Sequence, residues 1–417
     1  MEKKRVVITG MGVVAPNGIG IDNFWNSLVQ GRSGVRSITH FDASTYPCQV
    51  AAEVVGFEPN DYMEPKTARK LARFAQFALA ASKMAVEDSR ITLDSIDPQR
   101  IGVIIGTGIG GGDYIEKQHS IFIEKGIRRL SPRGAMIICA HSAVGIISCE
   151  LGFKGPNTTI SAACNSGLDA IYSAYNMIRL GDADIMLAGA GEAPITPCNV
   201  GLFCAGGILS SHNEEPQAAL KPFDVDSNGI VLGEGGAVII LEELQNALKR
   251  KAKIYAEILG YASGNESYDL FEKEPTGDAG SIVMGKAIEN AGLRPQDIDY
   301  ISAHGNGQQE FDLNETLAIK KAFGELAYQI PVTSIKPITG QSFSVTGILQ
   351  MITCVLVINN SIIPPTINHK NPRPHCDLNY VPDHLIKTEV NIALMNAMGF
   401  AGSDTVVIIG KSNGYNP

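Results

Sequence analysis

The hydrophobic pattern of the first half of the chain changes repeatedly between short apolar runs and longer amphipathic segments. The short runs predict strands, and the longer segments repeat their apolar residues at helical spacing. The predicted strands are residues 5–10, 101–108, 158–164 and 183–190, and the predicted helices are residues 65–88 and 167–181. Strands that alternate with helices favour an α/β architecture with a mainly parallel sheet.

The second half of the chain repeats this order. Its predicted strands are residues 256–264, 299–307, 331–340 and 404–410, and its predicted helices are residues 280–292 and 347–359. Residues 85–108 match residues 287–307, because both run from a helix through an acidic turn and a buried strand to a glycine loop. A chain of 417 residues also exceeds what one hydrophobic core usually serves. We therefore predict two duplicated halves, residues 1–250 and 251–417.

Two strand-to-helix junctions occupy related positions in these halves. TTISAACNSG in the first half corresponds to PVTSIKPITG in the second, so Cys164 and Lys336 lie at equivalent junctions. The backbone N–H groups that open a helix point outward and favour negative charge. We therefore expect a thiolate at Cys164 to be stabilised.

Composition and charge exclude several classes of protein. The chain is 44% hydrophobic and 18% charged, as expected of a globular protein, and its net charge of -9 provides no broad basic surface for nucleic acid. Its longest late apolar run, residues 351–360, is shorter than the roughly 20 residues that span a bilayer. We expect a soluble, cytoplasmic protein without a nucleic-acid or membrane partner.

The cysteines, histidines and glycines suggest neither a metal site nor a nicotinamide site. The eight cysteines form no CxxC pair, and the eight histidines show no i, i+4 pair. Two glycine-rich stretches, residues 10–15 and 106–111, imitate a dinucleotide site. The first is followed by PNGIG, which breaks a helix, and the second has no strand near residue 125.

One histidine lies where an α/β sheet usually meets its ligand. His304 ends a predicted buried strand in the glycine-flanked loop AHGNG. A cysteine with a histidine partner suits covalent acyl transfer, because the thiolate attacks a thioester and the histidine handles protons or charge in a second step. The candidates are Cys164, His304 and the segment 333–341, although other cysteine and histidine enzymes fit the same description.

Six motifs spread over almost the whole chain carry a family resemblance. They are VVITGMGVVAPNG, SAACNSGLDAI, KPFDVDSNGIVLGEGGAVIILE, AHGNG, TSIKPITG and GFAGSD. With these motifs the chain resembles the β-ketoacyl-[acyl-carrier-protein] synthases, elongating condensing enzymes of the thiolase fold. The resemblance implies two duplicated halves that form a five-layered αβαβα sandwich. It also implies decarboxylative Claisen condensation of an enzyme-bound acyl thioester with malonyl-acyl-carrier-protein.

The resemblance assigns roles to the candidate catalytic residues. Cys164 would take the growing acyl chain from the phosphopantetheine arm of an acyl carrier protein, and no other cofactor is implied. The backbone N–H groups of Cys164 and Phe400 would form the oxyanion hole, and Phe400 would gate the pocket. His304 would assist malonyl decarboxylation and stabilise the enolate, with Lys336 organising the charges behind it. Ile109 and Phe203 match positions that line the acyl tunnel, although both are equally consistent with plain core residues.

The chain also departs from the family pattern. Gln341 replaces a second catalytic histidine, and Gln350 replaces a glutamate. Gln341 still carries an NH₂ donor, so we expect an active enzyme with altered decarboxylation. The threonine-rich stretch that binds pantetheine becomes Asn306, Gly307 and Gln308, whose amides can still donate and accept.

A further departure and several short stretches bear on the pathway. Met398 and Ala401 alter the family's GFGG signature around Phe400. CNSGLDAI, EAPITP, TSIK, IPPTINH and CDLNYVP look most similar to the ketosynthase subunit of type II polyketide synthases. In that group the catalytic subunit pairs with a homologous chain-length factor that lacks the cysteine, whereas other condensing enzymes are homodimers. We predict a polyketide ketosynthase, with two alternatives: an elongating fatty-acid β-ketoacyl synthase, and a weakly catalytic partner subunit that resembles a chain-length factor.

Overall fold

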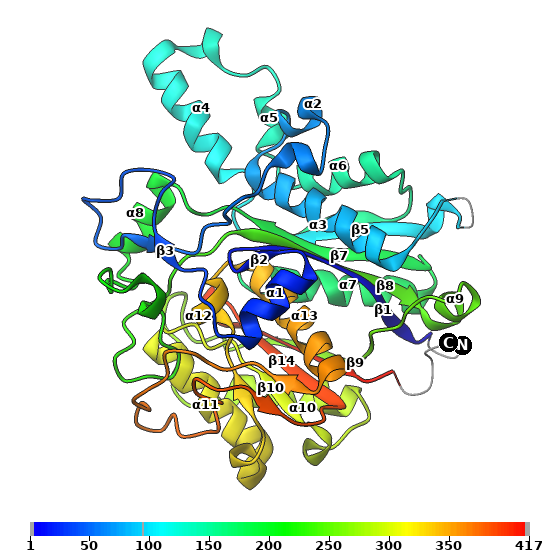
Figure 1. Ribbon diagram of the computed structural model, residues 1–417, viewed down its shortest axis with the longest axis vertical. Helices are drawn as coiled ribbons and strands as arrows, with labels where there is room; N and C mark the ends of the chain where they lie inside the picture. The colour runs from blue at the N-terminus through cyan, green and yellow to red at the C-terminus, as the bar shows by residue number, and fades with distance from the viewer. Residues whose placement is uncertain (1–3, 94–95, 413–417) are drawn as a thin grey trace.

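The computed structural model describes residues 4–93 and 96–412 and shows five stacked layers (Figure 1). Helices α3 (Arg73–Ser89) and α6 (Ser142–Leu151) cover the outer face of one sheet, and α10 (Asp278–Asn290) and α11 (Gln309–Phe323) cover that of the other. Helices α7 (Ser166–Leu180) and α13 (Ser344–Asn360) lie between the two sheets. The predicted thiolase-like αβαβα sandwich is therefore confirmed.

The two sheets have the same strand order, as the predicted duplication requires. The first contains β6 (Asn157–Ile160), β5 (Ile101–Gly106), β7 (Ile185–Glu192), β8 (Gly235–Glu243) and β1 (Val6–Ala15), in that order. The second contains β11 (Val332–Thr333), β10 (Tyr300–Ser302), β14 (Ile392–Met398), β15 (Ser403–Gly410) and β9 (Ala256–Asn265). Each strand of the first half thus has a counterpart at the same place in the second.

Antiparallel pairing joins the two sheets along one edge of each. Val7 and Ile8 of β1 pair with Glu257 and Ala256 of β9, so all ten strands, with the short β2 (Gly18–Ile19), belong to one continuous sheet. The prediction of a mainly parallel sheet is wrong. Parallel pairing is confined to β5 with β6 and β7, and to β10 with β11 and β14. β14 and β15, for example, are joined by residues 399–402 without a crossover helix, and such neighbours must run antiparallel.

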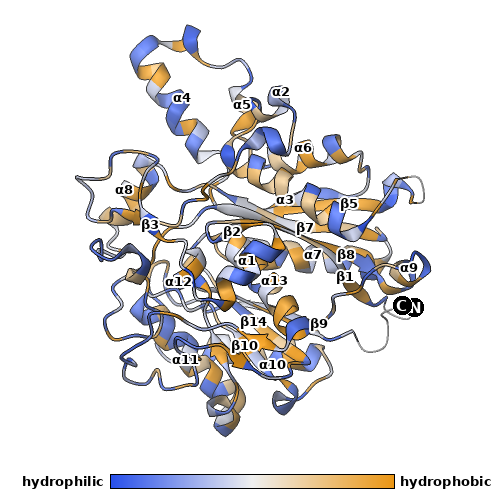
Figure 2. Ribbon diagram, in the orientation of Figure 1, coloured by the Kyte–Doolittle hydropathy of each residue, from blue (hydrophilic) through white to orange (hydrophobic). Residues whose placement is uncertain are grey.

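The core lies between the sheets. Every residue of α13 from Ser344 to Ile358 is buried, as expected for a helix that contacts protein on all sides. Figure 2 shows hydrophobic residues along β10 and β14 and hydrophilic residues on the surrounding loops. Among the helices of residues 4–93 and 96–412, none has both the length and the apolar character needed to cross a bilayer.

The peripheral elements are short, apart from α4. They are α1 (Ile21–Val29), β3 (Arg36–Ser37), β4 (Val50–Ala51), α2 (Pro65–Ala68), α4 (Gly112–Lys125), α5 (Gly134–Ile137), α8 (Pro197–Ala205), α9 (Leu244–Lys249), α12 (Lys336–Thr339), β12 (Ile362–Ile363) and β13 (Ile386–Lys387). Helix α4 projects from the body of the molecule (Figure 1).

Several element boundaries differ from the prediction. The predicted strand 331–340 ends at Thr333, and its last part contains helix α12. The predicted helix 65–88 is two helices, α2 and α3, because Ala72 between them is extended and Arg73 turns to pair with Glu234 at 2.7 Å. The predicted strand 158–164 ends at Ile160, and the predicted strand 299–307 ends at Ser302. Residues 94–95 of the predicted acidic turn, and residues 1–3 and 413–417 at the ends of the two predicted halves, lie outside the described residues.

Candidate active site

Cys164 lies in the tight turn between β6 and α7. Ala163 has a φ of 50°, which turns the chain back on itself, and α7 begins at Ser166. Ser166 Oγ accepts a hydrogen bond from the Ala162 N–H at 2.8 Å and donates one to the Ala163 carbonyl at 2.6 Å. The turn therefore holds Cys164 just before the positive end of α7, with 4% of the residue exposed.

Burial opposes the stabilisation that we expected for a thiolate at Cys164. Burial raises the pKa of the Cys164 thiol to about 11, although the Lys336 charge and a hydrogen bond from Gln341 lower it. The desolvation cost of a buried anion outweighs the stabilisation expected at the junction. Cys164 is therefore a neutral thiol at neutral pH in this closed site.

Gln341 reaches Cys164 from the equivalent junction of the second half. After β11 the chain forms α12, turns at Gly340 with a φ of 71°, and then places Gln341 before α13. Gln341 Nε2 donates to Cys164 Sγ at 3.1 Å. Gln341 Oε1 is buried and has no hydrogen-bond partner among the described residues. The amide therefore contacts the sulfur and keeps one polar atom free.

Lys336 and His304 form a second buried pair beside this one. Lys336 Nζ donates to the His304 carbonyl oxygen and lies 3.5 Å from His304 Nδ1. Burial lowers the pKa of Lys336 to about 8. The neighbouring acidic groups Glu315, Cys164 and Asp312 raise this pKa, but by less than burial lowers it. Lys336 thus links His304, which it contacts, with Cys164, whose pKa it lowers.

His304 is neutral and directs one N–H into the site. Burial lowers its pKa well below the ordinary value, and the charges of Lys336 and Lys273 add to this effect. Its Nδ1 accepts from the Met398 N–H at 3.2 Å, which assigns the ring proton to Nε2. Nε2 is buried without a partner among the described residues, so it is available to donate to a bound oxygen.

Two carboxylates on α11 hold the His304 loop, and the sequence prediction did not include them. Glu315 accepts from the backbone N–H groups of His304 and Gly305 at 2.6 and 2.8 Å. Asp312 accepts from the N–H groups of Asn306 and Gly307 at 3.0 and 3.2 Å, and burial raises its pKa to about 7. Two acids three residues apart, five and eight residues after AHGNG, were the available signal.

Phe400 lies beside both halves of the site. Its ring makes an edge contact with Phe311 at 5.9 Å, and Phe311 lies 6.1 Å from the His304 ring. The preceding residue, Gly399, lies against Asn165: if Gly399 carried a Cβ atom, that atom would lie 3.2 Å from Asn165 Oδ1. The loop of Phe400 therefore packs against the turn that carries Cys164. Among the described residues, no other residue accepts a hydrogen bond from the backbone N–H of Cys164 or Phe400. Both groups are therefore free to bind an oxyanion.

The predicted pantetheine residues bind each other. Asn306 Nδ2 donates to Gln308 Oε1 at 3.2 Å, and the Gln308 N–H donates to Asn306 Oδ1 at 2.9 Å. The Asn306 amide is thereby occupied, whereas the Gln308 NH₂ group has no such bond.

The predicted acyl-pocket residues pack in the same apolar cluster as Cys164. Ile109 and Phe203 are partly buried members of this cluster, which also contains Phe343. Glu192 at the end of β7 is fully buried next to it and accepts from the N–H groups of Gly108 and Ile109 at 2.7 and 3.0 Å. Burial raises the pKa of Glu192.

Gln350 has a structural role that explains the neutral amide. Its Nε2 lies 3.0, 2.9 and 3.1 Å from the carbonyl oxygens of Ser302, Ala303 and Asn396. The bonds tie α13 to the ends of β10 and β14, beneath His304. A carboxylate here would face three acceptors with nothing to donate, so the amide fits this chain better than a glutamate.

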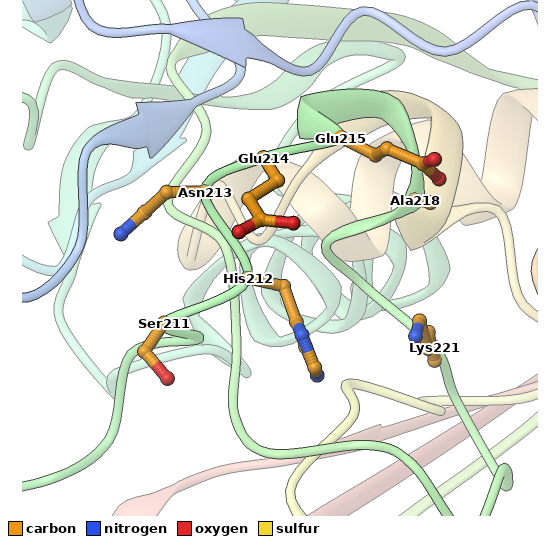
Figure 3. A pocket seen from close by; sticks show the side chains of 7 residues that line it. All are labelled: Ser211, His212, Asn213, Glu214, Glu215, Ala218 and Lys221. Carbon is orange, nitrogen blue, oxygen red and sulfur yellow. The ribbon is translucent and has the colours of Figure 1, made fainter.

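Other features do not provide a competing reaction site. A polar surface cavity of about 410 Å³ is formed within residues 211–221, and in Figure 3 the side chains of Asn213 and Glu215 point away from one another. It is lined by Ser211, His212, Asn213, Glu214, Glu215, Ala218 and Lys221. Within residues 4–93 and 96–412, no three His, Cys, Asp or Glu side chains are grouped to hold a metal ion. The buried thiol with its amide and imidazole neighbours remains the arrangement best suited to covalent chemistry.

The fold and this arrangement define a thiolase-like condensing enzyme, an acyltransferase. The chain belongs to the β-ketoacyl synthase family: residues 3–247 match the family "Beta-ketoacyl synthase, N-terminal domain", and residues 255–370 match "Beta-ketoacyl synthase, C-terminal domain". The family resemblance of the six sequence motifs is thereby confirmed.

Relatives of known name cover the whole length of the chain. The 3-oxoacyl-[acyl-carrier-protein] synthase 2 of Coxiella burnetii is 41% identical over 414 residues, 99% of each chain, and that of Synechocystis sp. is 39% identical over 411 residues, also 99% of each. Two solved structures are similar in fold. One, "type II PKS acyl-carrier protein in complex with its ketosynthase bound to the hexaketide", has a TM-score of 0.92 at 34% identity over 98% of this chain and 100% of that one. The other, "The ishigamide ketosynthase/chain length factor", has a TM-score of 0.93 at 32% identity over 99% and 100%.

Proposed function

We propose that this protein is an elongating β-ketoacyl-acyl-carrier-protein synthase. The observation that carries the proposal is the pairing of the Cys164 thiol with the Gln341 amide, next to the unpartnered Nε2–H of a neutral His304. A buried nucleophile with two neutral donors suits a reaction in which negative charge develops first on a thioester oxygen and then on an enolate.

In the first step, Cys164 accepts the acyl group. Sγ attacks the carbonyl carbon of an acyl thioester on the carrier protein, and the oxyanion of the tetrahedral intermediate binds the free N–H groups of Cys164 and Phe400. Collapse breaks the bond to the pantetheine sulfur. The thiol proton leaves Cys164 and ends on that sulfur, so the carrier protein departs as the free thiol.

In the second step, malonyl-carrier protein binds and loses carbon dioxide. The electrons of the broken C–C bond pass into the thioester as an enolate, whose oxygen accepts hydrogen bonds from His304 Nε2–H and the Gln341 NH₂ group. The enolate carbon attacks the Cys164 thioester, and the Cys164 thiolate leaves. Lys336, whose charge lowers the Cys164 pKa, stabilises that thiolate.

The curated relatives favour the fatty-acid alternative over the polyketide prediction. Relatives about 40% identical over the full chain are named 3-oxoacyl-[acyl-carrier-protein] synthase 2, whereas the structures described as type II PKS ketosynthase and ketosynthase/chain length factor are 34% and 32% identical. The polyketide prediction is therefore not confirmed. We propose an acyl carrier protein as the substrate partner, and a second ketosynthase-like chain, identical or homologous, as the structural partner.

Acylation of the cysteine tests the proposed function. Incubation with acyl-carrier protein should add one acyl mass to the protein, measured by intact mass spectrometry, and Cys164→Ala should abolish it. The matched control is Cys354→Ala, which removes a fully buried thiol in α13. This variant should be acylated normally. If no carrier acylates the wild type while it still binds a second ketosynthase-like chain, the weakly catalytic partner subunit is the correct function.

A further inference from the structure

Phe343 has an unusual backbone conformation close to the active site. It follows Gln341 by two residues and precedes α13, with φ 42° and ψ -112°. A bulky residue rarely adopts a positive φ, and such strain persists only where the surrounding structure holds it. The conformation of Phe343 therefore depends on its neighbours.

Hydrogen bonds on the C-terminal side hold Phe343 in this conformation. The Phe343 carbonyl accepts from the Thr346 N–H at 3.2 Å, and the Ser344 hydroxyl donates to Glu192 Oε2 at 2.7 Å. Glu192 also binds the Gly108 and Ile109 N–H groups. One buried carboxylate thus fixes the start of α13 to the loop that carries Ile109.

The Phe343 ring lies in the apolar cluster that contains Cys164. It stacks on Phe203 with a centroid distance of 5.3 Å and an interplanar angle of 29°, and Phe343 is 5% exposed. Gly108 lies between Phe343 and the turn of Cys164: if Gly108 carried a Cβ atom, that atom would lie 3.8 Å from Phe343 Cβ and 3.9 Å from the Ala163 carbonyl oxygen. Phe343 therefore borders the turn of Cys164 as well as the predicted pocket residue Phe203.

We propose that Phe343 is a specificity-determining residue that limits the length of the acyl chain carried by Cys164. The inference rests on the proposed function. Cys164 is 4% exposed, so an acyl chain bound to its sulfur must displace packed side chains. The stacked rings of Phe343 and Phe203 lie in the same apolar cluster as Cys164, and the Ser344–Glu192 bond opposes their displacement.

The test compares acylation of Cys164 by butyryl- and dodecanoyl-carrier protein, each rate measured by intact mass. In Phe343→Ala the ratio of the dodecanoyl to the butyryl rate should rise by about tenfold, because space worth several methylene groups is opened. Phe343→Leu should raise the ratio less. Ser344→Ala should also raise it modestly, because it releases the bond to Glu192 and leaves the ring in place.

Phe223→Leu is the matched control. Phe223 is also buried, has a φ of 61° and stacks on Tyr380 at 4.0 Å, but it belongs to a different core cluster. Its replacement should leave the ratio unchanged, even if the protein is less stable. An unchanged ratio in folded, acylated Phe343→Ala overturns the proposal, and if that variant does not fold, the ratio in Phe343→Leu decides. Failure of the wild type to be acylated by either carrier would instead overturn the proposed function.

Discussion

The two strand-to-helix junctions of the duplicated halves have the same place in the topology and different chemistry. In the first half, β6 turns directly into α7 and presents one thiol among apolar side chains. In the second half, β11 is followed by the extra turn of helix α12, so that Lys336 and Gln341 precede α13. The extra turn lets one side chain contact His304 and the other contact Cys164.

The comparison extends to the buried charges. Among the described residues, the second half supplies His304, Asp312, Glu315 and Asp404, all at least nine-tenths buried around its junction. In the first half, Glu192 is the corresponding buried acid beside Cys164. Duplication of a fold thus provides two similar frameworks, and divergence placed the nucleophile in one and the buried imidazole, ammonium and carboxylates around it in the other.

The largest effect should come from removing His304. We expect His304→Ala to reduce condensation by about 10²- to 10³-fold, the usual cost of a lost oxyanion donor. Acylation of Cys164 should stay within a factor of about three, because the hydrogen bond to the sulfur comes from Gln341. Intact mass separates the two steps. His369→Ala, which removes another buried histidine, is the control, and an equal loss of acylation in His304→Ala would contradict this division of labour.

Gln341 should show a smaller effect that reaches both steps. We expect Gln341→Leu to reduce malonyl decarboxylation by about 10- to 10²-fold, because one neutral donor is lost. It should also slow acylation, because the hydrogen bond that lowers the Cys164 pKa disappears. Gln341→His should retain or raise decarboxylation, measured as carbon dioxide release, because its N–H can also donate. Inactivity of a folded Gln341→His protein would show that the amide does something a ring N–H does not.

The smallest effect concerns stability and tests the charge difference between the halves. Burial raises the pKa of Asp404 to about 7, so between about pH 4 and pH 7 the folded state binds more protons than the unfolded state. This contribution to the free energy of unfolding is therefore fully present below about pH 4 and is lost as the pH rises through 7. Asp404→Asn should be more stable than wild type at pH 8 by about 1–2 kcal/mol and not at pH 4, measured by urea denaturation.

The control for this prediction is Asp182→Asn, an exposed substitution in the first half. It should change stability by less than about 0.5 kcal/mol at either pH. Asp404→Asn also removes the ion pair between Asp404 and Lys273, whose charged atoms lie 3.8 Å apart. Lys273 keeps Glu266 as its partner, so the loss of this ion pair should not dominate the change in stability. A stability gain at pH 4 equal to that at pH 8 would contradict an origin in the Asp404 proton.

Periodicity located eight of the ten strands of the two sheets and four of the six helices that cover them or lie between them, and the repeat placed Cys164 and Lys336 at equivalent junctions. Periodicity missed β8, β14, α6 and α11. It did not reveal the break at residues 69–72, because Arg73 turns toward Glu234, a partner 161 residues away. The strand-to-helix junctions also identified Cys164, His304 and the segment 333–341 as candidates, whereas the layered sandwich and the roles of Phe400, Ile109 and Phe203 came from the family motifs. Glu192, Asp312 and Glu315 were not predicted, since the role of a buried carboxylate depends on backbone N–H groups from other segments. The pathway prediction relied on five short stretches, which do not report the depth of a pocket.

The antiparallel pairing of β1 with β9 has a consequence for how the enzyme moves. A hydrogen-bonded seam joins the two sheets, so we expect the halves to stay fixed relative to one another when the site opens. Access to Cys164 must then come from local rearrangement of side chains and short loops such as residues 399–402. Catalytic turnover would therefore proceed on a rigid frame, and its speed would depend on a few residues at the entrance and on the floor of the pocket.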